Sequence, residues 1–150
     1  MLEANLIDVN TNQVNGGWVI RDHEGVPKAW GSSLLKLTTS PLEAEALALL
    51  CSLQQAWIRG FTKVYFEGDC KILIDSINNE SIDSSITGIY ADIKFWAAKF
   101  KEVYFSHVNH CCNQVAHNLA QYGSIDTSFY SDIQNPLTWI VNILYDDLSN

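Results

Sequence analysis

A chain of 150 residues, of which 47% are hydrophobic and 17% charged, has the composition of a folded globular protein and not of a disordered one. Its length predicts one domain with a substantial core, and no apolar run approaches the roughly 18 residues that span a bilayer. The net charge of −8, with only nine Lys and Arg residues, argues against strong non-specific binding to nucleic acid, because phosphate contacts need cations.

The N-terminus and the cysteines favour an intracellular protein, nuclear or cytoplasmic. Residues 1–10, MLEANLIDVN, contain no basic region and no apolar stretch of the signal-peptide kind. The cysteines do not have the spacing of a disulfide framework, so we expect reduced thiols at Cys51, Cys70, Cys111 and Cys112. The last two lie near His110 and His117, but this spacing matches no standard zinc motif.

The first part of the chain predicts an antiparallel meander of three strands. Asn5–Val9 is expected to form the first strand and Gly16–Arg21 the second, which is rich in β-prone side chains. The segment Asp-His-Glu-Gly at residues 22–25 predicts a hairpin turn, since glycine tolerates a positive φ. Val26–Leu37 then returns as the third strand, with an irregularity expected around Gly31.

A long apolar helix is expected over Pro41–Arg59. Ser40 is a favourable N-cap, and proline is tolerated at the first helical position because that N–H has no partner within a helix. Gly60 is a good C-terminal cap. The segment has almost no polar side chain, so the helix must be covered on most sides. Two carboxylates, Glu43 and Glu45, nevertheless lie in its first turns, and a buried carboxylate needs a cation, a proton or water.

A second acid follows at the end of the next strand. The strand Lys63–Glu67 ends at Gly68 and Asp69, and the C-terminal edge of a strand is a usual place for ligands in α/β sheets. A helix is expected from Asp69 to about Asn79. The acid on the first helix and the acid at the strand end could therefore share one metal site.

The order of elements predicts an α/β fold with a five-stranded mixed sheet and helices on both faces. The remaining elements are a helix from about Ser84 to Phe100, a strand over Glu102–Val108, a helix over Cys112–Tyr122, a polar connection over Ser124–Gln134 and an amphipathic helix over Leu137–Leu148. We place the core of the single domain at about residues 4–122 and the C-terminal helical extension at about 135–148.

Four segments in this order resemble a known family. They are GGWVIRDHEG at the second strand, SPLEAEALALL at the first helix, FEGDC at the end of the fourth strand and HVNHCCNQVAHNLA before the last core helix. With them the chain resembles ribonuclease H-like domains, specifically the plant group related to the reverse-transcriptase-associated domains of non-LTR retroelements. The resemblance extends from about residue 16 to about residue 122 and implies the ribonuclease H-like fold.

The resemblance also implies a chemistry, that of an endoribonuclease that cuts the RNA strand of an RNA/DNA hybrid. The carboxylates of the family hold two divalent cations about 4 Å apart, one of which activates water while the other stabilises the leaving 3′ oxygen. Hard oxygen ligands suit Mg²⁺ or Mn²⁺. The expected partner is a hybrid or another nucleic acid, bound by a monomer through backbone and 2′-OH contacts and without sequence specificity.

Two family acids fall on well-matched positions. The helix acid falls on Glu45, although helical phase alone would not choose it over Glu43. The alternative for Glu45 is an acid that answers the helix dipole. The strand-end acid falls on Asp69, for which the alternative is an N-cap of the following helix.

Two other positions depart from the family pattern. Asp8 is the only acid in the first strand, but Val9 follows it where the family has Gly or Ala, and the loop to Gly16 is several residues shorter. A solvated aspartate in a terminal strand is the alternative. His117 replaces the usual Asp of the last helix. A neutral imidazole can bind a metal or position water, yet it removes a negative charge, and a partly exposed helical histidine is the alternative.

Further features leave the function open. Some nucleases of the family use a mobile histidine before the last helix, and His107 and His110 lie in that neighbourhood. The basic helical segment that helps bacterial relatives hold hybrids is absent. The rival interpretation is a catalytically degenerate domain that binds nucleic acid or protein, supported by the acidic charge and the altered positions. A 3′–5′ exonuclease of the same superfold would need further acids in other motifs, which the sequence lacks.

Overall fold

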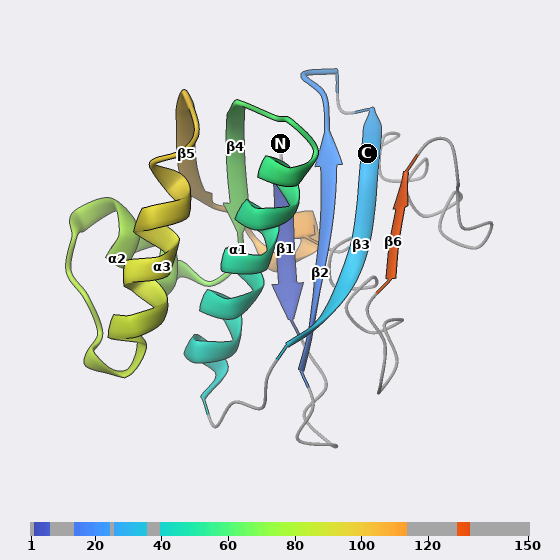
Figure 1. Ribbon diagram of the computed structural model, residues 1–150. Helices are drawn as coiled ribbons and strands as arrows, with labels where there is room; N and C mark the ends of the chain where they lie inside the picture. The colour runs from blue at the N-terminus through green and yellow to red at the C-terminus, as the bar shows by residue number, and fades with distance from the viewer. Residues whose placement is uncertain (1, 7–13, 25, 36–39, 114–128, 133–150) are drawn as a thin grey trace.

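A computed structural model describes residues 2–6, 14–24, 26–35, 40–113 and 129–132 of the chain. Its strands are β1 (Leu2–Leu6), β2 (Val14–Arg21), β3 (Pro27–Leu35), β4 (Lys63–Gly68), β5 (Glu102–His107) and β6 (Phe129–Asp132). Its helices are α1 (Pro41–Ile58), α2 (Lys71–Asn79) and α3 (Thr87–Ala97), with the 3-10 turns η1 (Ser84–Ile86) and η2 (His110–Asn113). The strands form one mixed sheet in the order β5-β4-β1-β2-β3-β6 (Figure 1).

Strand β1 joins the two halves of the sheet. It runs antiparallel to β2, with Leu2 opposite Ile20, and parallel to β4, with Leu2 opposite Phe66. This double pairing begins at residue 2, so the strand begins earlier than the predicted Asn5–Val9, of which residues 7–9 fall outside the described part. Because β1 and β4 are parallel, their C-terminal ends lie at the same edge of the sheet.

The hairpin between β2 and β3 confirms the predicted turn. The backbone N–H of Asp22 donates to the carbonyl of Val26 at 3.0 Å, and the Asp22 carboxylate accepts from the N–H groups of Glu24 and Val26 at 2.9 Å. The predicted irregularity around Gly31 is wrong, because Gly31 pairs regularly with β2 and the register shifts beside the turn instead, after Ile20.

A sixth strand corrects the prediction of five. β6 lies within the segment that was expected to be a polar connection, and it pairs antiparallel with β3, where Ser131 lies opposite Trp30. Its Phe and Tyr favour an extended backbone, but the strand is only four residues long, and two of these residues are the polar Ser131 and Asp132, which hides the signal. The expected helix over Leu137–Leu148 lies outside the described residues, as does the one over Cys112–Tyr122 except for its first two residues, which belong to η2.

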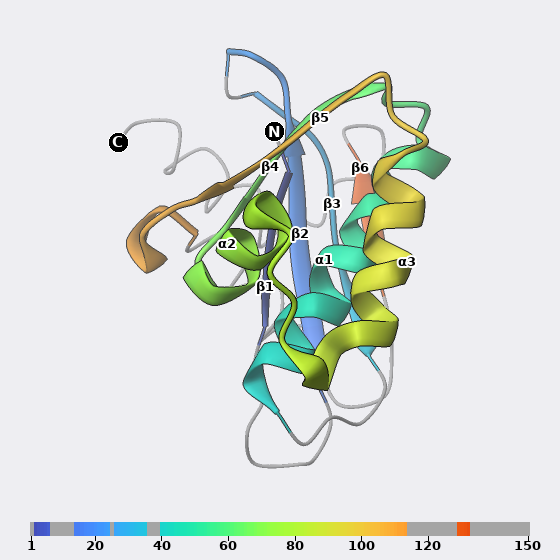
Figure 2. The same cartoon turned by 90° about the vertical axis from the view of Figure 1, so that its left-hand side faces the viewer.

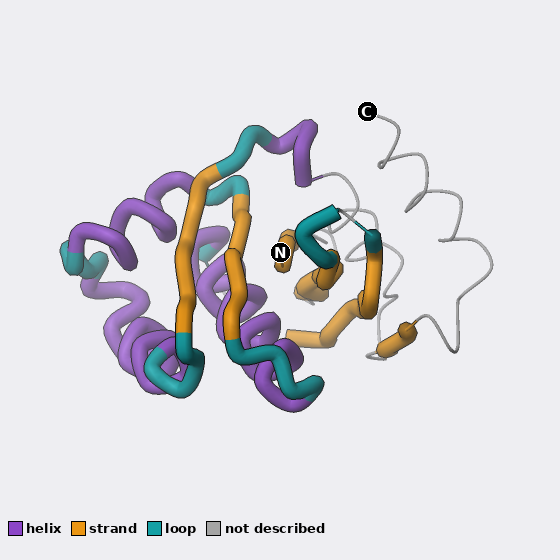
Figure 3. The backbone as a smooth tube through the Cα atoms, turned by 90° about the horizontal axis from the view of Figure 1, so that it is seen from above, coloured by secondary structure: helices purple, strands orange, loops and turns teal. Residues whose placement is uncertain are grey.

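Helix α1 is the central element of the core and follows the predicted range. The Ser40 hydroxyl accepts from the N–H of Glu43 at 3.5 Å, and Gly60 follows the helix with a φ of 83°. Leu53 and Ala56 are fully buried against the sheet. α1 and α3 lie on the same side of the sheet (Figure 2), and Figure 3 shows this layer of helices from above.

The segment that was predicted as one helix from Ser84 to Phe100 is divided. Asp83 accepts from the N–H of Ser85 at 2.8 Å and so caps the short turn η1, after which α3 begins at Thr87. The predicted apolar face is confirmed, since Ile86, Tyr90, Ile93 and Ala97 are buried while Ile89 and Trp96 pack partly buried against the core.

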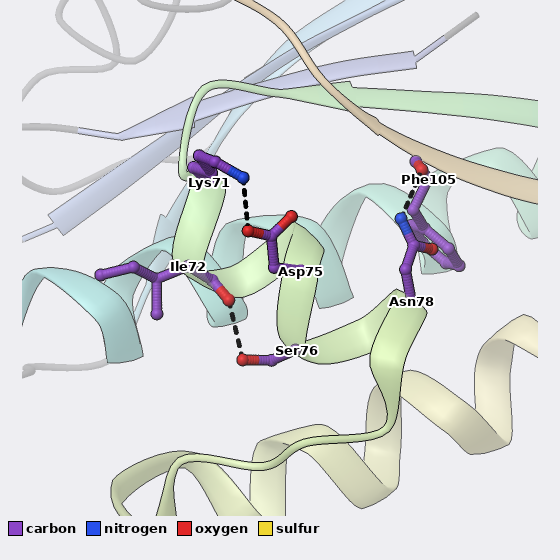
Figure 4. Close-up of polar contacts among 6 residues, drawn as sticks. All are labelled: Lys71, Ile72, Asp75, Ser76, Asn78 and Phe105. Atoms are coloured by element: carbon purple, nitrogen blue, oxygen red, sulfur yellow. Dashed lines mark hydrogen bonds and ion pairs between the residues drawn. The ribbon is translucent and has the colours of Figure 1, made fainter.

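Helix α2 lies against the outer strand β5. The side-chain amide of Asn78 donates to the carbonyl of Phe105 at 3.0 Å, which satisfies a backbone group of that strand (Figure 4). The helix is itself supported by an ion pair between Lys71 and Asp75, one turn apart. The hydrogen bond between Asn78 and Phe105 covers part of the edge of β5, which would otherwise be able to pair with another chain.

In the described part of the chain, no helix is long and apolar enough to cross a membrane.

Candidate functional site

The structure brings Glu45 and Asp69 together at the C-terminal end of β4. Asp69 directly follows that strand, and Glu45 extends from the first turns of α1, which packs across the same end of the sheet. Burial, and in addition the negative charge of Asp69, raises the pKa of Glu45 from 4.5 to about 8. At neutral pH the Glu45 carboxyl is therefore mostly protonated, and a cation placed beside it would replace the proton.

Neither acid is used mainly for helix capping. Helix α2 begins at Lys71 with Cys70 in the cap position, so Asp69 precedes the cap and the predicted start at Asp69 is wrong. At the start of α1, the first-turn acid is Glu43, whose backbone N–H is the one capped by Ser40. Glu45 thus lies beyond the first turn of α1, and Asp69 lies one residue before the cap of α2.

A histidine that sequence reasoning placed only in the neighbourhood contacts Asp69 directly. The Nδ1 of His110 lies 2.7 Å from Oδ2 of Asp69, and the N–H of Val108 donates to the carbonyl of Gly68 at 3.0 Å, which holds the chain after β5 against the end of β4. An ionised carboxylate can only accept, so the proton of this contact is on the imidazole. His107, the other candidate, is the last residue of β5 and lies opposite Gly68.

The contact between His110 and Asp69 contributes little electrostatic free energy. The His110 side chain is 57% exposed and that of Asp69 is 13% exposed, so water screens the imidazole. The spacing signal that could have selected His110 is its place three residues after β5, which runs parallel to β4 and ends at the same edge.

A narrow hollow between α1, β4 and α2 adjoins the two acids. It is lined by Glu45, Leu49, Glu67, Gly68, Cys70, Leu73 and Ile74. Burial raises the pKa of the Cys70 thiol, which keeps it protonated and unsuited to act as a soft metal ligand. Burial also raises the pKa of Glu67, an acid that the sequence analysis did not single out.

The donor chemistry of the two acids fits a hard divalent cation. Carboxylate oxygens are what Mg²⁺ prefers, and it is often held by one or two carboxylates together with water and substrate phosphates. Among the residues that the structure describes, no group of three or more His, Cys, Asp or Glu side chains is arranged to hold a metal ion. The other two predicted site residues, Asp8 and His117, lie outside the described residues.

A larger cleft of about 500 Å³ lies at the opposite end of β4. Its walls include Arg21, Lys63, Tyr65 and Tyr104, and it contains none of the predicted site residues. Ion pairs occupy its rim, Asp22 with Lys28 at 2.9 Å and Lys63 with Glu102 at 2.5 Å.

Solved structures of similar fold are ribonucleases H. RNase H1 from the archaeon Halobacterium salinarum superimposes with a TM-score of 0.74 at 19% identity, covering 80% of this chain and 92% of that one. LC11-RNase H1 in complex with an RNA/DNA hybrid gives 0.72 at 17% identity, covering 81% and 93%. An N-terminal RNase H domain from Mycobacterium tuberculosis gives 0.69 at 16% identity, covering 81% and 91%. These likenesses show that the fold is ribonuclease H-like.

The sequence comparison assigns the family. A search of curated proteins finds no match to the sequence. The family model described as reverse transcriptase-like matches residues 5–123, which is most of the chain. The chain therefore belongs to the reverse transcriptase-like family.

Proposed function

We propose that this domain is an endoribonuclease that hydrolyses the RNA strand of RNA/DNA hybrids with Mg²⁺ or Mn²⁺. The observation that carries the proposal is the pair of neighbouring carboxyl groups, Glu45 and Asp69, at the C-terminal end of β4 in a ribonuclease H-like fold. Two carboxylates placed together cost free energy unless something positive or a proton compensates them. The hybrid bound to LC11-RNase H1 supports this choice of substrate.

Glu45 and Asp69 would hold the cation through their carboxylate oxygens, with Asp8 as a weaker third ligand and His117 as a further member of the site. Two cations bound there would supply the activation of water and the stabilisation of the leaving 3′ oxygen. Glu45 must lose its proton to bind, so it exchanges a proton for a metal ion. His110 holds one oxygen of Asp69 and thereby fixes the orientation of that carboxylate.

The substrate would be recognised by shape, through the sugar–phosphate backbone and the 2′-OH groups. The net charge of −8 predicts weak binding, since few cations are available for phosphate. Within the reverse transcriptase-like family we place the chain in the plant group related to non-LTR retroelements, on the strength of the segments FEGDC and NQVAHNLA.

The test is cleavage of an end-labelled RNA/DNA hybrid in Mg²⁺ and separately in Mn²⁺. We expect cuts in the RNA strand that disappear in Asp69→Asn, a variant that keeps the shape of the side chain and removes its charge. Asp75→Asn is the matched control, because Asp75 is an exposed acid of α2 paired with Lys71. Absence of cleavage by folded wild-type protein in both metals would refute the proposal.

The second candidate is an interaction module without catalysis. It is favoured by the contact of Asp69 with His110, which already engages one of the two acids, and by the acidic net charge. This candidate predicts binding of a hybrid, or of a protein, that Asp69→Asn leaves unchanged. A filter-binding or anisotropy measurement with the same labelled hybrid separates the two candidates.

A further inference from the structure

Two adjacent cysteines lie next to the candidate site and have no role in the proposed cleavage. Cys111 and Cys112 are consecutive residues of η2, and both side chains are exposed. Their Sγ atoms are 3.9 Å apart. The residue before them is His110, which contacts Asp69.

We propose that Cys111 and Cys112 are a reversible oxidation site, a vicinal dithiol that closes to a disulfide and thereby displaces His110 from Asp69. The two sulfurs need to approach by about 2 Å to reach the S–S bond length of about 2.05 Å. Both are open to solvent, so an oxidant reaches them without unfolding of the chain.

The geometry of neighbouring residues makes such a bond easy to reverse. Consecutive Cα atoms are about 3.8 Å apart across a trans peptide, whereas bridged cysteines usually have Cα atoms about 4.4–6.8 Å apart. A disulfide between neighbours is therefore strained. Strained and exposed disulfides are the labile ones that cellular thiols reduce, which is the behaviour of a regulatory bond and not of a structural one.

The oxidant that we name is a small-molecule disulfide such as glutathione disulfide. The thiolate of one cysteine attacks a glutathione sulfur, which breaks the glutathione S–S bond, forms a mixed disulfide and releases one glutathione. The second cysteine, after losing its proton, attacks the protein sulfur of that mixed disulfide and releases the second glutathione. In total the protein loses two protons and two electrons, and one glutathione disulfide becomes two glutathione thiols.

Formation of the disulfide closes a ring in the backbone of η2, and this changes the turn that carries His110. η2 is held by a hydrogen bond from the N–H of Cys112 to the carbonyl of Asn109 at 2.8 Å, and the ring would include the peptide between residues 111 and 112. Twisting that peptide moves the donor N–H of Cys112 and the backbone of the preceding residue. The 2.7 Å contact between His110 and Asp69 lies one residue away and cannot be preserved unchanged.

The other two cysteines provide an internal comparison. Cys51 lies within α1 and Cys70 at the start of α2, and both side chains are partly buried. Burial raises the pKa of Cys70, which lowers the fraction of reactive thiolate. Oxidation is therefore expected at Cys111 and Cys112 before either of these residues.

The experiment is to incubate the full chain with glutathione disulfide, digest it without reduction and weigh the peptide that contains both cysteines. We expect this peptide to lose two hydrogen atoms without a retained glutathione, and to regain them on treatment with dithiothreitol. In Cys111→Ser and in Cys112→Ser the remaining thiol should instead keep one glutathione. Cys51→Ser, the matched control, should behave as the wild type. Phenylarsine oxide, which bridges two neighbouring thiols, should bind the wild type one to one and neither single variant at the same dose.

A second readout tests the link to the site independently of catalysis. The imidazole signals of His110 in an NMR spectrum should shift on oxidation of the wild type and return on treatment with dithiothreitol, and they should stay unchanged when the double variant Cys111→Ser/Cys112→Ser is treated in the same way. A persistent glutathione adduct on the wild type, an intermolecular disulfide, a disulfide with Cys70, or no reaction would overturn the oxidation site. A vicinal disulfide that leaves the His110 signals in place would overturn the link to Asp69. The effect on cleavage rests on the proposed function, but neither of these readouts does.

Discussion

The two ends of β4 differ in the charged side chains that they bring together. At its start, Lys63 pairs with Glu102 on the neighbouring strand at 2.5 Å, and the hydrogen bond that Lys63 donates to this carboxylate raises the pKa of Lys63. At its end lie two neighbouring acids, Glu45 and Asp69, and burial together with the charge of Asp69 raises the pKa of Glu45 to about 8. At the start of β4 the two opposite charges compensate each other, whereas at its end the proximity of two partly buried acids costs free energy.

The charged groups at the two ends of β4 also differ in what they contribute to the stability of the fold. The pair at the start is exposed, with side chains 64% and 47% accessible, so it adds little to stability. The acids at the end are kept together by the packing of α1, whose Leu53 and Ala56 are fully buried against the sheet. Such an arrangement is expected where a cation or a proton is part of the function.

The largest effect that separates the two ends is expected on cleavage. Asp69→Asn should reduce cleavage of an RNA/DNA hybrid by at least about 100-fold, because a cation contributes several kcal/mol to the stabilisation of the transition state. Glu102→Gln, at the other end, should leave the rate within about twofold, since no step of the proposed reaction involves it. Initial rates on a labelled hybrid at saturating Mg²⁺ measure both. Equal losses in the two variants would contradict the assignment of the site to the end of β4.

Much of the fold could be predicted from the sequence because the signals were local. Ser40, Pro41 and Gly60 mark the limits of α1, and the structure follows them. β6 could not be predicted, because four residues within a polar segment become a strand only through pairing with β3. The position of β1 was likewise decided by pairing, with β2 and β4 on its two sides.

The site was predictable to a smaller extent. Glu45 and Asp69 were named from helix and strand-end positions together with the family resemblance, and the structure places them within electrostatic reach. The choice of Glu45 over Glu43 depended on the resemblance. The contact between His110 and Asp69 joins residues 41 positions apart, and it depends on the parallel pairing of β5 with β4, which brings the end of β5 to Asp69.

The next effect concerns the pH dependence of stability without metal. The pKa of Glu45 is about 8 in the folded protein and 4.5 ordinarily, so between these values the folded state holds a proton that the unfolded state has lost. Stability is therefore full below about pH 4.5 as far as this residue is concerned, and it falls as the pH rises toward 8. Each pKa unit corresponds to about 1.4 kcal/mol, so the decrease in the free energy of unfolding is several kcal/mol and at most about 5.

Urea unfolding at pH 5, 6, 7 and 8 in the presence of EDTA measures this decrease. Glu45→Gln keeps the hydrogen-bonding shape of the protonated acid and cannot ionise, so its stability should fall less steeply over this range than that of the wild type. Glu43→Gln is the matched control on the same helix and should retain the slope of the wild type. A wild-type profile as flat as that of Glu45→Gln would mean that neither burial nor the charge of Asp69 raises the pKa of Glu45 in the folded protein.

Metal binding should oppose the decrease in the free energy of unfolding that occurs as the pH rises. A ligand at 100 times its dissociation constant adds about 2.7 kcal/mol to the stability of the folded state. Because Mg²⁺ must displace the proton of Glu45, its stabilising effect should be larger at pH 8 than at pH 6. Melting curves with and without Mg²⁺ at the two pH values test this, with Ca²⁺ as a cation that fits a larger oxygen cage. Equal stabilisation at both pH values would place the bound ion away from Glu45.

The smallest effect is expected at the start of β4. The pKa of Lys63 is raised in the folded protein. This residue therefore contributes stability that is fully present below its ordinary pKa of 10.5 and is lost only as the pH rises beyond that value. Between pH 5 and 8 the pair with Glu102 therefore adds no slope, and salt should screen what it does contribute. Glu102→Gln should leave the melting temperature almost unchanged at 0.5 M NaCl, where Glu45→Gln still alters the pH profile, because a partly buried charge is screened less than an exposed one. If salt removed both effects alike, the acids at the end of β4 would be as open to water as the ion pair at its start, and the contrast between the two ends would no longer hold.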